Sequence, residues 1–150
     1  MERELEFKIG TRSQRVAVPE EVLLGVLEPN EIAAPVTGEA AVRQALASPI
    51  GTPRLRDLVR PGEKIAIVTS DITRPMPTWV VMPPLLEELY SAGVRPEDIT
   101  LVFALGSHRP HTEAEQRHLA GEQAFAQITC VDSDVTDCVH VGVTARGTPV

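Results

Sequence analysis

The sequence predicts an α/β fold in which a mainly parallel sheet with flanking helices follows an N-terminal β-hairpin. Residues 64–69 form a near-continuous apolar run with the pattern of a parallel strand buried on both faces, and residues 99–105 form a second apolar strand. A polar loop and a helical pattern follow each run, which is the rhythm of βαβ units with right-handed crossovers. With 150 residues, the chain is long enough for one domain with its own core.

The first forty residues predict the hairpin and a loop. Leu5, Phe7 and Ile9 alternate with charged residues, and a second strand pattern, RVAVP, begins at residue 15 after a polar turn. The short apolar stretch 23–27 is interpreted as a further strand, and the proline-bounded stretch that follows it as a loop.

Four helical segments are expected in the rest of the chain. Residues 38–48 are rich in alanine and end before Pro49, and a short helical turn at 55–60 is stopped by a Pro-Gly pair. Residues 78–92 predict a helix that kinks or starts at Pro83 and Pro84. The last helix begins at residue 112, where the spacing of threonine and glutamate is that of a capping box.

Two further short strands are expected near the end, at residues 128–131 and 139–144. The order of elements is Rossmann-like, and the final residues look like the start of a strand that is not completed. We interpret residues 1–150 as an N-terminal domain, truncated inside a larger two-domain protein.

Composition and charge exclude several classes of protein. Fourteen basic and 21 acidic residues give a net charge of −7, which disfavours nucleic acid or an anionic membrane surface as a partner. The charged N-terminus does not resemble a signal peptide, and no apolar run approaches the roughly 20 residues of a membrane span. Two cysteines are too few for a disulfide-stapled secreted fold, so the chain is expected to be cytoplasmic.

Two polar loops follow consecutive strands, at the edge where open α/β sheets bind ligands. The loops are residues 70–75, SDITRP, and residues 106–111, GSHRPH. Guanidinium groups match carboxylate or phosphate, and an imidazole exchanges protons near neutrality. The sequence therefore predicts a site for a small anionic molecule, formed by Asp71, Thr73, Arg74, His108 and Arg109.

A purely structural interpretation of these loops stands beside this one. Asp71 would then cap a helix or hold a turn, and each Arg-Pro pair would be a rigid exit from a strand. His111 is expected to be a solvated residue of the first helical turn, because two histidines without a third ligand do not make a zinc site. The remaining candidates are expected to be structural or solvent-exposed, with a divalent-cation site as the alternative for the aspartates: His118, His140, Cys130, Cys138, Asp132, Asp134 and Asp137.

At the two loops the sequence resembles the N-terminal domain of the nickel-dependent lactate racemase family. The resemblance is carried by SDITRP after the strand IAIV and by GSHRP after the strand LVFAL, and it covers roughly residues 40–150. It implies an isomerase that racemises or epimerises 2-hydroxy acids of the lactate type. It also implies a nickel-pincer nucleotide cofactor, nickel pyridinium-3,5-bisthiocarboxylate mononucleotide.

The resemblance also implies roles for single residues. Asp71, Ile72, Thr73 and Arg74 would contact the cofactor, Arg74 with Arg109 would bind the substrate anion, and His108 would be one of two acid/base histidines. His108 would remove the hydroxyl proton while the Cα hydride passes to the cofactor.

In the family, the other parts of the active site lie downstream of the segment that this chain covers. They are the second histidine, the lysine joined covalently to the cofactor and the histidine that binds nickel, so no metal ligand is assigned here. The isolated chain is therefore expected to be inactive, with the remainder of the parent polypeptide as its partner.

Two other functions remain open at this point. A phosphohydrolase would use Asp71 as nucleophile or metal ligand and His108 as acid, but Thr73 stands where a second carboxylate would be needed and a glycine-rich phosphate loop is missing. A small-anion-binding module without catalysis would use Arg74 and Arg109.

Overall fold

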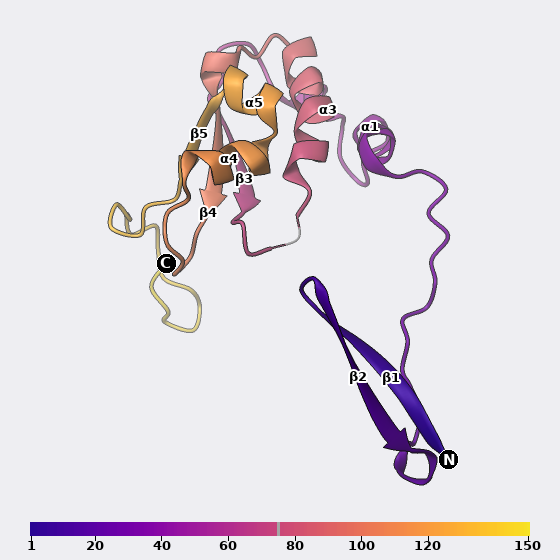
Figure 1. The fold of residues 1–150 in the computed structure, drawn as a ribbon. Helices are drawn as coiled ribbons and strands as arrows, with labels where there is room; N and C mark the ends of the chain where they lie inside the picture. Colours follow the sequence, from indigo (N-terminus) through magenta and orange to yellow (C-terminus); the bar gives the residue numbers. More distant parts are fainter. Residues whose placement is uncertain (75) are drawn as a thin grey trace. The chain divides into compact units, whose positions relative to one another are not determined.

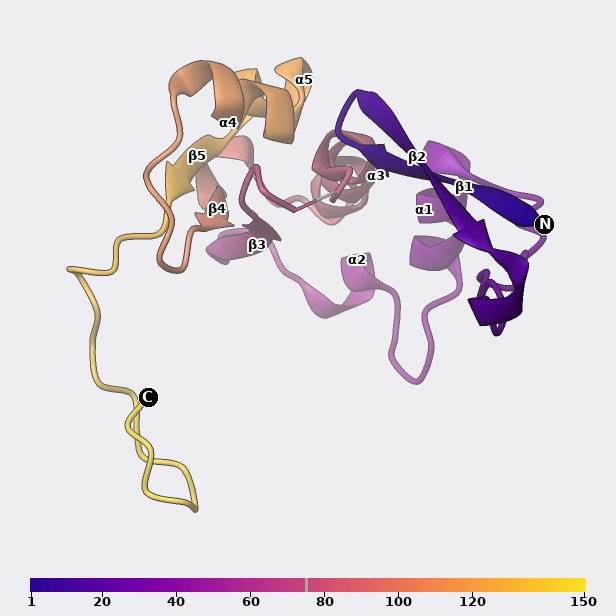
Figure 2. The ribbon, with the colours of Figure 1, turned by 60° about the horizontal axis from the view of Figure 1, so that its bottom comes forward.

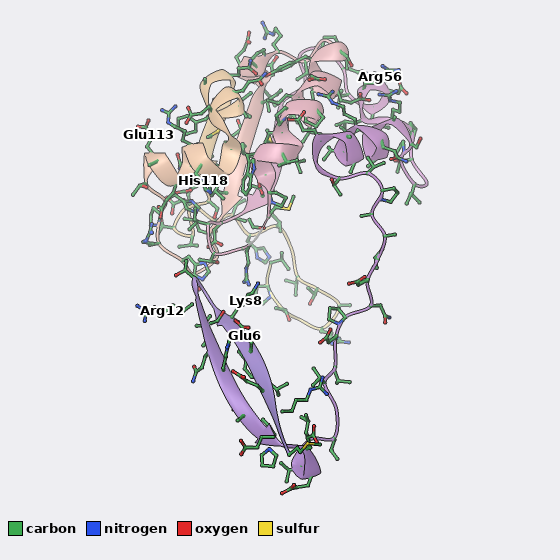
Figure 3. The ribbon with its side chains drawn as sticks, turned by 45° about the vertical axis from the view of Figure 1, so that its right-hand side comes forward. Glu6, Lys8, Arg12, Arg56, Glu113 and His118 are labelled. Atoms are coloured by element: carbon green, nitrogen blue, oxygen red, sulfur yellow. The ribbon has the colours of Figure 1, made fainter. Side chains whose placement is uncertain are left out.

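The computed structural model describes residues 1–74 and 76–150, and it divides into two compact units, Met1–Ala34 and Pro35–Val150. The first unit is an antiparallel hairpin of β1 (Glu2–Ile9) and β2 (Arg12–Pro19), which confirms the predicted opening element (Figure 1). Gly10 in the connecting turn has a φ of 59°, a conformation that glycine adopts without strain. The side chains of Glu6, Lys8 and Arg12 extend from the hairpin into solvent (Figure 3).

The strand expected at residues 23–27 is wrong. A 3-10 turn, Glu20–Val22, follows β2, and the next residues form no strand. Leu24 and Leu27 are fully exposed, so this apolar stretch has neither a strand to pair with nor a core to enter. A backbone without a pairing partner gains nothing from the extended conformation of a strand.

The second unit contains the predicted parallel sheet. Its strand order is β3-β4-β5, and Ile65 of β3 pairs with Ile99 of β4, while Thr100 pairs with Thr129 of β5. Helix α3 connects the first two strands, and α4 with α5 connects the second two (Figure 1). The strands are β3 (Ile65–Ser70), β4 (Ile99–Ala104) and β5 (Thr129–Asp132).

The predicted helices are confirmed, and one of the two alternatives given for residues 78–92 is excluded. Helix α3 begins at Thr78 and runs through Pro83 and Pro84, so the prolines do not mark its start. Thr112 and Glu115 form the predicted capping box at the start of α4. The helices of this unit are α1 (Gly38–Ala47), α2 (Leu55–Leu58), α3 (Thr78–Ser91), the 3-10 turn η2 (Pro96–Asp98), α4 (Glu113–Ala120) and α5 (Glu122–Gln127).

The core lies between the sheet and the helices that pack on one of its faces (Figure 2). Leu101 and Phe103 of β4 are completely buried and belong to the same cluster as Leu86 of α3 and Leu119 of α4. The alternate residues of β4 point the other way: Thr100 and Val102 are half-buried and Ala104 is exposed. Burial of the apolar side chains on one face therefore holds the strands and helices together.

The opposite face of the sheet is more open than the apolar runs predict. Val68 of β3 is 67% exposed and Val131 of β5 is 38% exposed, and Ala66 is exposed as well. The expectation that both faces of the first strand are buried is therefore wrong for β3. A continuous apolar run matches a strand covered on both sides, but the described residues cover only one side of this strand.

The end of the chain differs from expectation at one element. The strand predicted at 128–131 is present as β5, but residues 139–144 form only an isolated antiparallel bridge between Val143 and Pro149. This segment turns back on itself, with hydrogen bonds such as Thr144 N to Thr148 O at 2.9 Å. In the described part of the chain, no helix has the length and apolar character that crossing a membrane requires.

Candidate active site

Asp71 follows directly after β3 and is 3% exposed. Its Oδ1 accepts hydrogen bonds from the hydroxyl of Thr73 at 2.7 Å and from the backbone N–H of Thr73 at 3.2 Å. Its carbonyl oxygen accepts the N–H of Arg74 at 3.1 Å. The residue thus closes the turn that leaves the strand, as the structural interpretation of this loop expected.

The second oxygen of the same carboxylate, Oδ2, pairs with Nδ1 of His108. His108 lies in the loop after β4, where its backbone N–H donates a hydrogen bond to the carbonyl of Leu105 at 3.0 Å. Parallel pairing of β3 with β4 places the two loops at one edge of the sheet, so residues far apart in the sequence meet there.

Hydrogen bonds from the Thr73 hydroxyl, and next from His108, lower the pKa of Asp71 to about 2. The carboxylate is therefore ionised at neutral pH and can only accept hydrogen bonds. Nδ1 of His108 must then donate, which leaves the lone pair of the neutral ring on Nε2. The arrangement is that of a histidine oriented to take up a proton at Nε2.

A cavity of about 590 Å³ opens beside this pair. The cavity is lined by the last residues of β3 and β4, by Arg74 of the loop after β3 and by Ser107 of the loop after β4. A neighbouring cavity of about 350 Å³ shares Asp71 and His108 and reaches Ile72, Thr73, Arg109 and His111. A guanidinium, several hydroxyls and an imidazole surround these cavities, which suits a small anion.

Arg109 was expected to be available for binding an anion, but its guanidinium is already paired within the loop. Its guanidinium makes two hydrogen bonds to the Glu115 carboxylate, at 2.9 and 2.7 Å, and a third to the carbonyl of Pro110 at 2.9 Å. The Arg109 guanidinium, and next the N–H of Thr112, lower the pKa of Glu115 to about 2. A large part of the Arg109 charge is therefore already balanced inside the loop.

His111 is not a solvated residue, so that expectation is wrong. Its side chain is 1% exposed and lies between Asp132 and the backbone N–H of Ile72. Asp132 likewise does not belong to an exposed acidic loop, because it ends β5 and its side chain is 15% exposed. The sequence signal that we missed is the position of Asp132 at the end of a third parallel strand. The first two loops were located by the same argument, because the carboxyl ends of parallel strands meet at one edge of the sheet.

The other singled-out residues lie outside these cavities. The ring of His118 lies against Trp79 with 5.3 Å between centroids, and His140 is exposed. Cys130 is half-buried in β5, where burial raises its thiol pKa to about 11, and Cys138 is exposed. Within residues 1–74 and 76–150, no three His, Cys, Asp or Glu side chains gather in a group that could hold a metal ion. Pro75 of the first motif lies outside the described residues.

The fold and this edge together define an open α/β protein whose carboxylate-held histidine and nearby arginine border a small-molecule cavity. The chain belongs to the family described as the lactate racemase N-terminal domain, which it matches over residues 9–150.

Two curated relatives and one solved structure are similar to the chain. The lactate racemase of Thermoanaerobacterium thermosaccharolyticum is 32% identical over 120 residues, which are 79% of this chain and 28% of the relative. The lactate racemase of Lactiplantibacillus plantarum is 34% identical over 113 residues, 73% of this chain and 26% of the relative. The structure of the lactate racemase apoprotein from T. thermosaccharolyticum superposes with a TM-score of 0.83 at 28% identity, covering 98% of this chain and 34% of that one. The chain thus spans about a third or less of these proteins.

Proposed function

We propose that the chain is the cofactor-binding and partly catalytic N-terminal domain of a racemase or epimerase of 2-hydroxy acids. The observation that carries the proposal is the Asp71 and His108 pair beside a cavity that Arg74 also lines. Membership of the lactate racemase N-terminal domain family supports it. The parent protein would be an isomerase, and the two free cysteines favour a cytoplasmic location.

The residues at the cavity fit the nucleotide part of a nickel-pincer nucleotide. Ser70 and Ser107 offer hydroxyl donors that suit a phosphate of the cofactor, and Arg74 lines the same cavity beside them. The ionised Asp71 suits the positive charge of a pyridinium ring. Among the described residues no three His, Cys, Asp or Glu side chains form a metal-binding group of their own. By the family resemblance, the protein ligand to nickel would come from the remainder of the parent polypeptide.

When bound, the cofactor would supply a reversible acceptor for the Cα hydride of the substrate. His108 takes the hydroxyl proton of the 2-hydroxy acid at Nε2, because its Nδ1 is already committed to Asp71. The Asp71 carboxylate then stabilises the imidazolium that forms. The substrate loses one proton and one hydride and becomes a 2-keto acid, which can be reduced again from either face.

Arg74 holds the substrate carboxylate in this proposal, since it lines the larger cavity and its backbone is fixed to Asp71. Ile72 and Thr73 complete the cofactor contact from the same turn. Arg109 assists at the smaller cavity, with its charge moderated by Glu115. A second base on the other face of the substrate would come from the remainder of the parent polypeptide, so residues 1–150 alone would not racemise a 2-hydroxy acid.

The test uses the complete gene product loaded with the cofactor. Conversion of L-lactate and D-lactate is followed by chiral chromatography, and native mass spectrometry with nickel analysis detects the cofactor. Removing a general base lowers kcat by about 10²- to 10⁴-fold, so we expect a loss of that order in His108→Ala. The control is His140→Ala, because His140 is exposed and outside both cavities.

Three results would contradict the proposal. One is racemisation at the normal rate by His108→Ala. Another is a parent protein that racemises no 2-hydroxy acid but hydrolyses phosphate esters in a reaction that Asp71→Asn abolishes, which would identify a phosphohydrolase. The third is binding of an anion without turnover of either substrate class, which would indicate the non-catalytic module.

A further inference from the structure

His111 is a buried polar residue to which the proposed chemistry gives no role. It stands in the loop between β4 and α4, its side chain is 1% exposed, and its ring lies edge-on against Phe103 with 5.4 Å between centroids. Burial of an imidazole among apolar side chains is costly unless its nitrogens are hydrogen-bonded. Both nitrogens have partners, and these partners come from two other parts of the chain.

The partners determine which nitrogen carries the proton. The backbone N–H of Ile72 donates to Nε2 at 3.0 Å, and a backbone amide nitrogen is only a donor, so Nε2 holds the lone pair. The proton of the neutral ring is then on Nδ1, which lies 2.6 Å from Oδ1 of Asp132. The other oxygen, Oδ2, accepts the backbone N–H of His111 at 2.7 Å. One carboxylate therefore holds both the ring and the backbone of His111.

Asp132 keeps its charge in this position. Burial raises the pKa of its carboxyl, but the hydrogen bonds from the His111 side chain and backbone outweigh burial, so the pKa lies below its ordinary value. Ser133, the residue directly after β5, binds the start of the same loop that carries His111. Its hydroxyl accepts the N–H of Leu105 at 3.0 Å, and its own N–H donates to the carbonyl of Phe103 at 2.9 Å. The end of β5 thus anchors the loop after β4 directly, and it anchors the loop after β3 through the bond between His111 and Ile72.

The bond to Ile72 acts on the peptide unit that joins Asp71 to Ile72. The carbonyl of this unit accepts the N–H of Arg74 at 3.1 Å, and its N–H donates to His111 at 3.0 Å. Both ends of the peptide are therefore held, which sets the direction in which the Asp71 side chain leaves the backbone. Loss of the His111 bond would free the N–H end of this peptide and leave the backbone N–H of Ile72 without its side-chain partner.

We propose that His111 is a positioning residue. As a neutral imidazole held on Asp132, it fixes the Asp71–Ile72 peptide and thereby places the Asp71 carboxylate against His108. The catalytic consequence of this inference rests on the proposed function, whereas the placement of Asp71 against His108 is measurable in the protein without cofactor.

Two variants of similar size separate the two bonds of the ring. In His111→Gln the amide oxygen can reach the place of Nε2 and keep an acceptor for Ile72. In His111→Asn the amide NH₂ can reach the place of Nδ1 and keep a donor for Asp132, but the acceptor for Ile72 is lost. A displacement of about 1 Å at a catalytic group costs about 10²-fold in rate. We expect kcat of the complete, cofactor-loaded gene product to fall by about that factor in His111→Asn, with little change in KM, and to recover most of its value in His111→Gln.

The readout without activity is the ¹⁵N and ¹H NMR spectrum of the histidine rings in the complete gene product. We expect His111 as the Nδ1–H tautomer. A low-field proton is expected on Nδ1 of His108, retained in His111→Gln and lost or shifted upfield in His111→Asn. The matched control is His118→Asn, because His118 packs on Trp79 and lines neither cavity of the site. If His111→Asn does not fold, Asp132→Asn replaces it and should weaken the same low-field signal.

An Nε2–H or cationic ring at His111, or equal kcat and equal His108 signals in the Asn and Gln variants, would overturn the inference. A parent protein without racemase activity would refute the proposed function alone, since the tautomer and the His108 signal would still report the positioning. Loss of racemisation in both variants with an unchanged His108 signal would also overturn it, because positioning predicts that the two change together.

Discussion

Asp71 joins its own turn to His108, because one of its carboxylate oxygens accepts two hydrogen bonds from Thr73 and the other pairs with the imidazole. The two residues lie after different strands and meet only because those strands are parallel neighbours. Asp71 therefore fits both interpretations that the sequence left open for this loop, because it closes a structural turn and also belongs to the candidate active site.

Replacement of Asp71 by asparagine should reverse the tautomer of His108. The amide oxygen can still accept from Thr73, so the NH₂ group faces Nδ1 and forces the ring proton onto Nε2, where it blocks proton uptake. We expect kcat for a 2-hydroxy acid to fall by about 10²-fold or more, measured by chiral chromatography. Asp134→Asn is the matched control, because Asp134 accepts the same pair of bonds from Thr136, at 2.8 and 2.7 Å, outside the site. Equal activity of the two variants would contradict the prediction.

Glu115 should make the stability of the protein depend on pH in acid. Its pKa in the folded chain is lowered to about 2 from an ordinary value of 4.5, so the folded state binds fewer protons than the unfolded state between these values. The stabilisation is present above about pH 4.5 and is lost as the pH falls towards 2. Urea unfolding of Glu115→Gln should show a smaller decrease between pH 5 and 2.5 than the wild type.

The control for this measurement is Glu113→Gln on the same helix, since the side chain of Glu113 is 72% exposed (Figure 3). Its acid profile should follow that of the wild type. A Glu115→Gln profile as steep as the wild type would show that the carboxylate contributes no pH-dependent stability.

Two apolar residues of the sheet should respond differently to truncation. Leu101 is completely buried, so Leu101→Ala removes buried methyl groups and leaves a cavity, which costs about 2–5 kcal/mol. Val68 is 67% exposed, and Val68→Ala should change the free energy of unfolding by no more than about 0.5 kcal/mol. Chemical denaturation of residues 1–150 measures both. A large cost for Val68→Ala in this chain would mean that the open face of the sheet is covered.

The two arginines of the loops should contribute unequally to substrate binding. Arg109 already shares two hydrogen bonds with Glu115, whereas Arg74 lines the larger cavity. We expect Arg74→Ala to raise KM for a 2-hydroxy acid by about 10-fold or more, in line with the loss of a charged hydrogen bond of about 1.5–3 kcal/mol. Arg109→Ala should raise KM less. The reverse order would assign the substrate carboxylate to Arg109.

Much of the fold was predictable because its signals are local. Alternation at residues 5–9 predicted the hairpin, the apolar runs predicted β3 and β4, and the capping box at Thr112 predicted the start of α4. The errors at 23–27 and 139–144 share one cause. Both stretches have strand-like composition, but a strand also needs a neighbour, and periodicity does not show whether one is available.

For the site, the order of strands was sufficient to predict that Asp71 and His108 lie at one edge of the sheet, because neighbouring parallel strands end at the same edge. The partner of Arg109 was not anticipated, although Glu115 is close in sequence, because the capping box already accounted for that residue. The role of His111 was missed because its partners come from another loop and from the end of β5.

The sequence by itself determined which elements form and in which order, since hydrophobic period, caps and prolines act within a few residues. It also determined which reactive side chains follow the consecutive strands at this edge of the sheet: an aspartate, an arginine and a histidine. Only the tertiary structure decided that His111 is buried on Asp132 and that one face of β3 is open. Burial and hydrogen-bond partners depend on which distant segments are brought into contact, and it is packing of the sheet against its helices that brings them there.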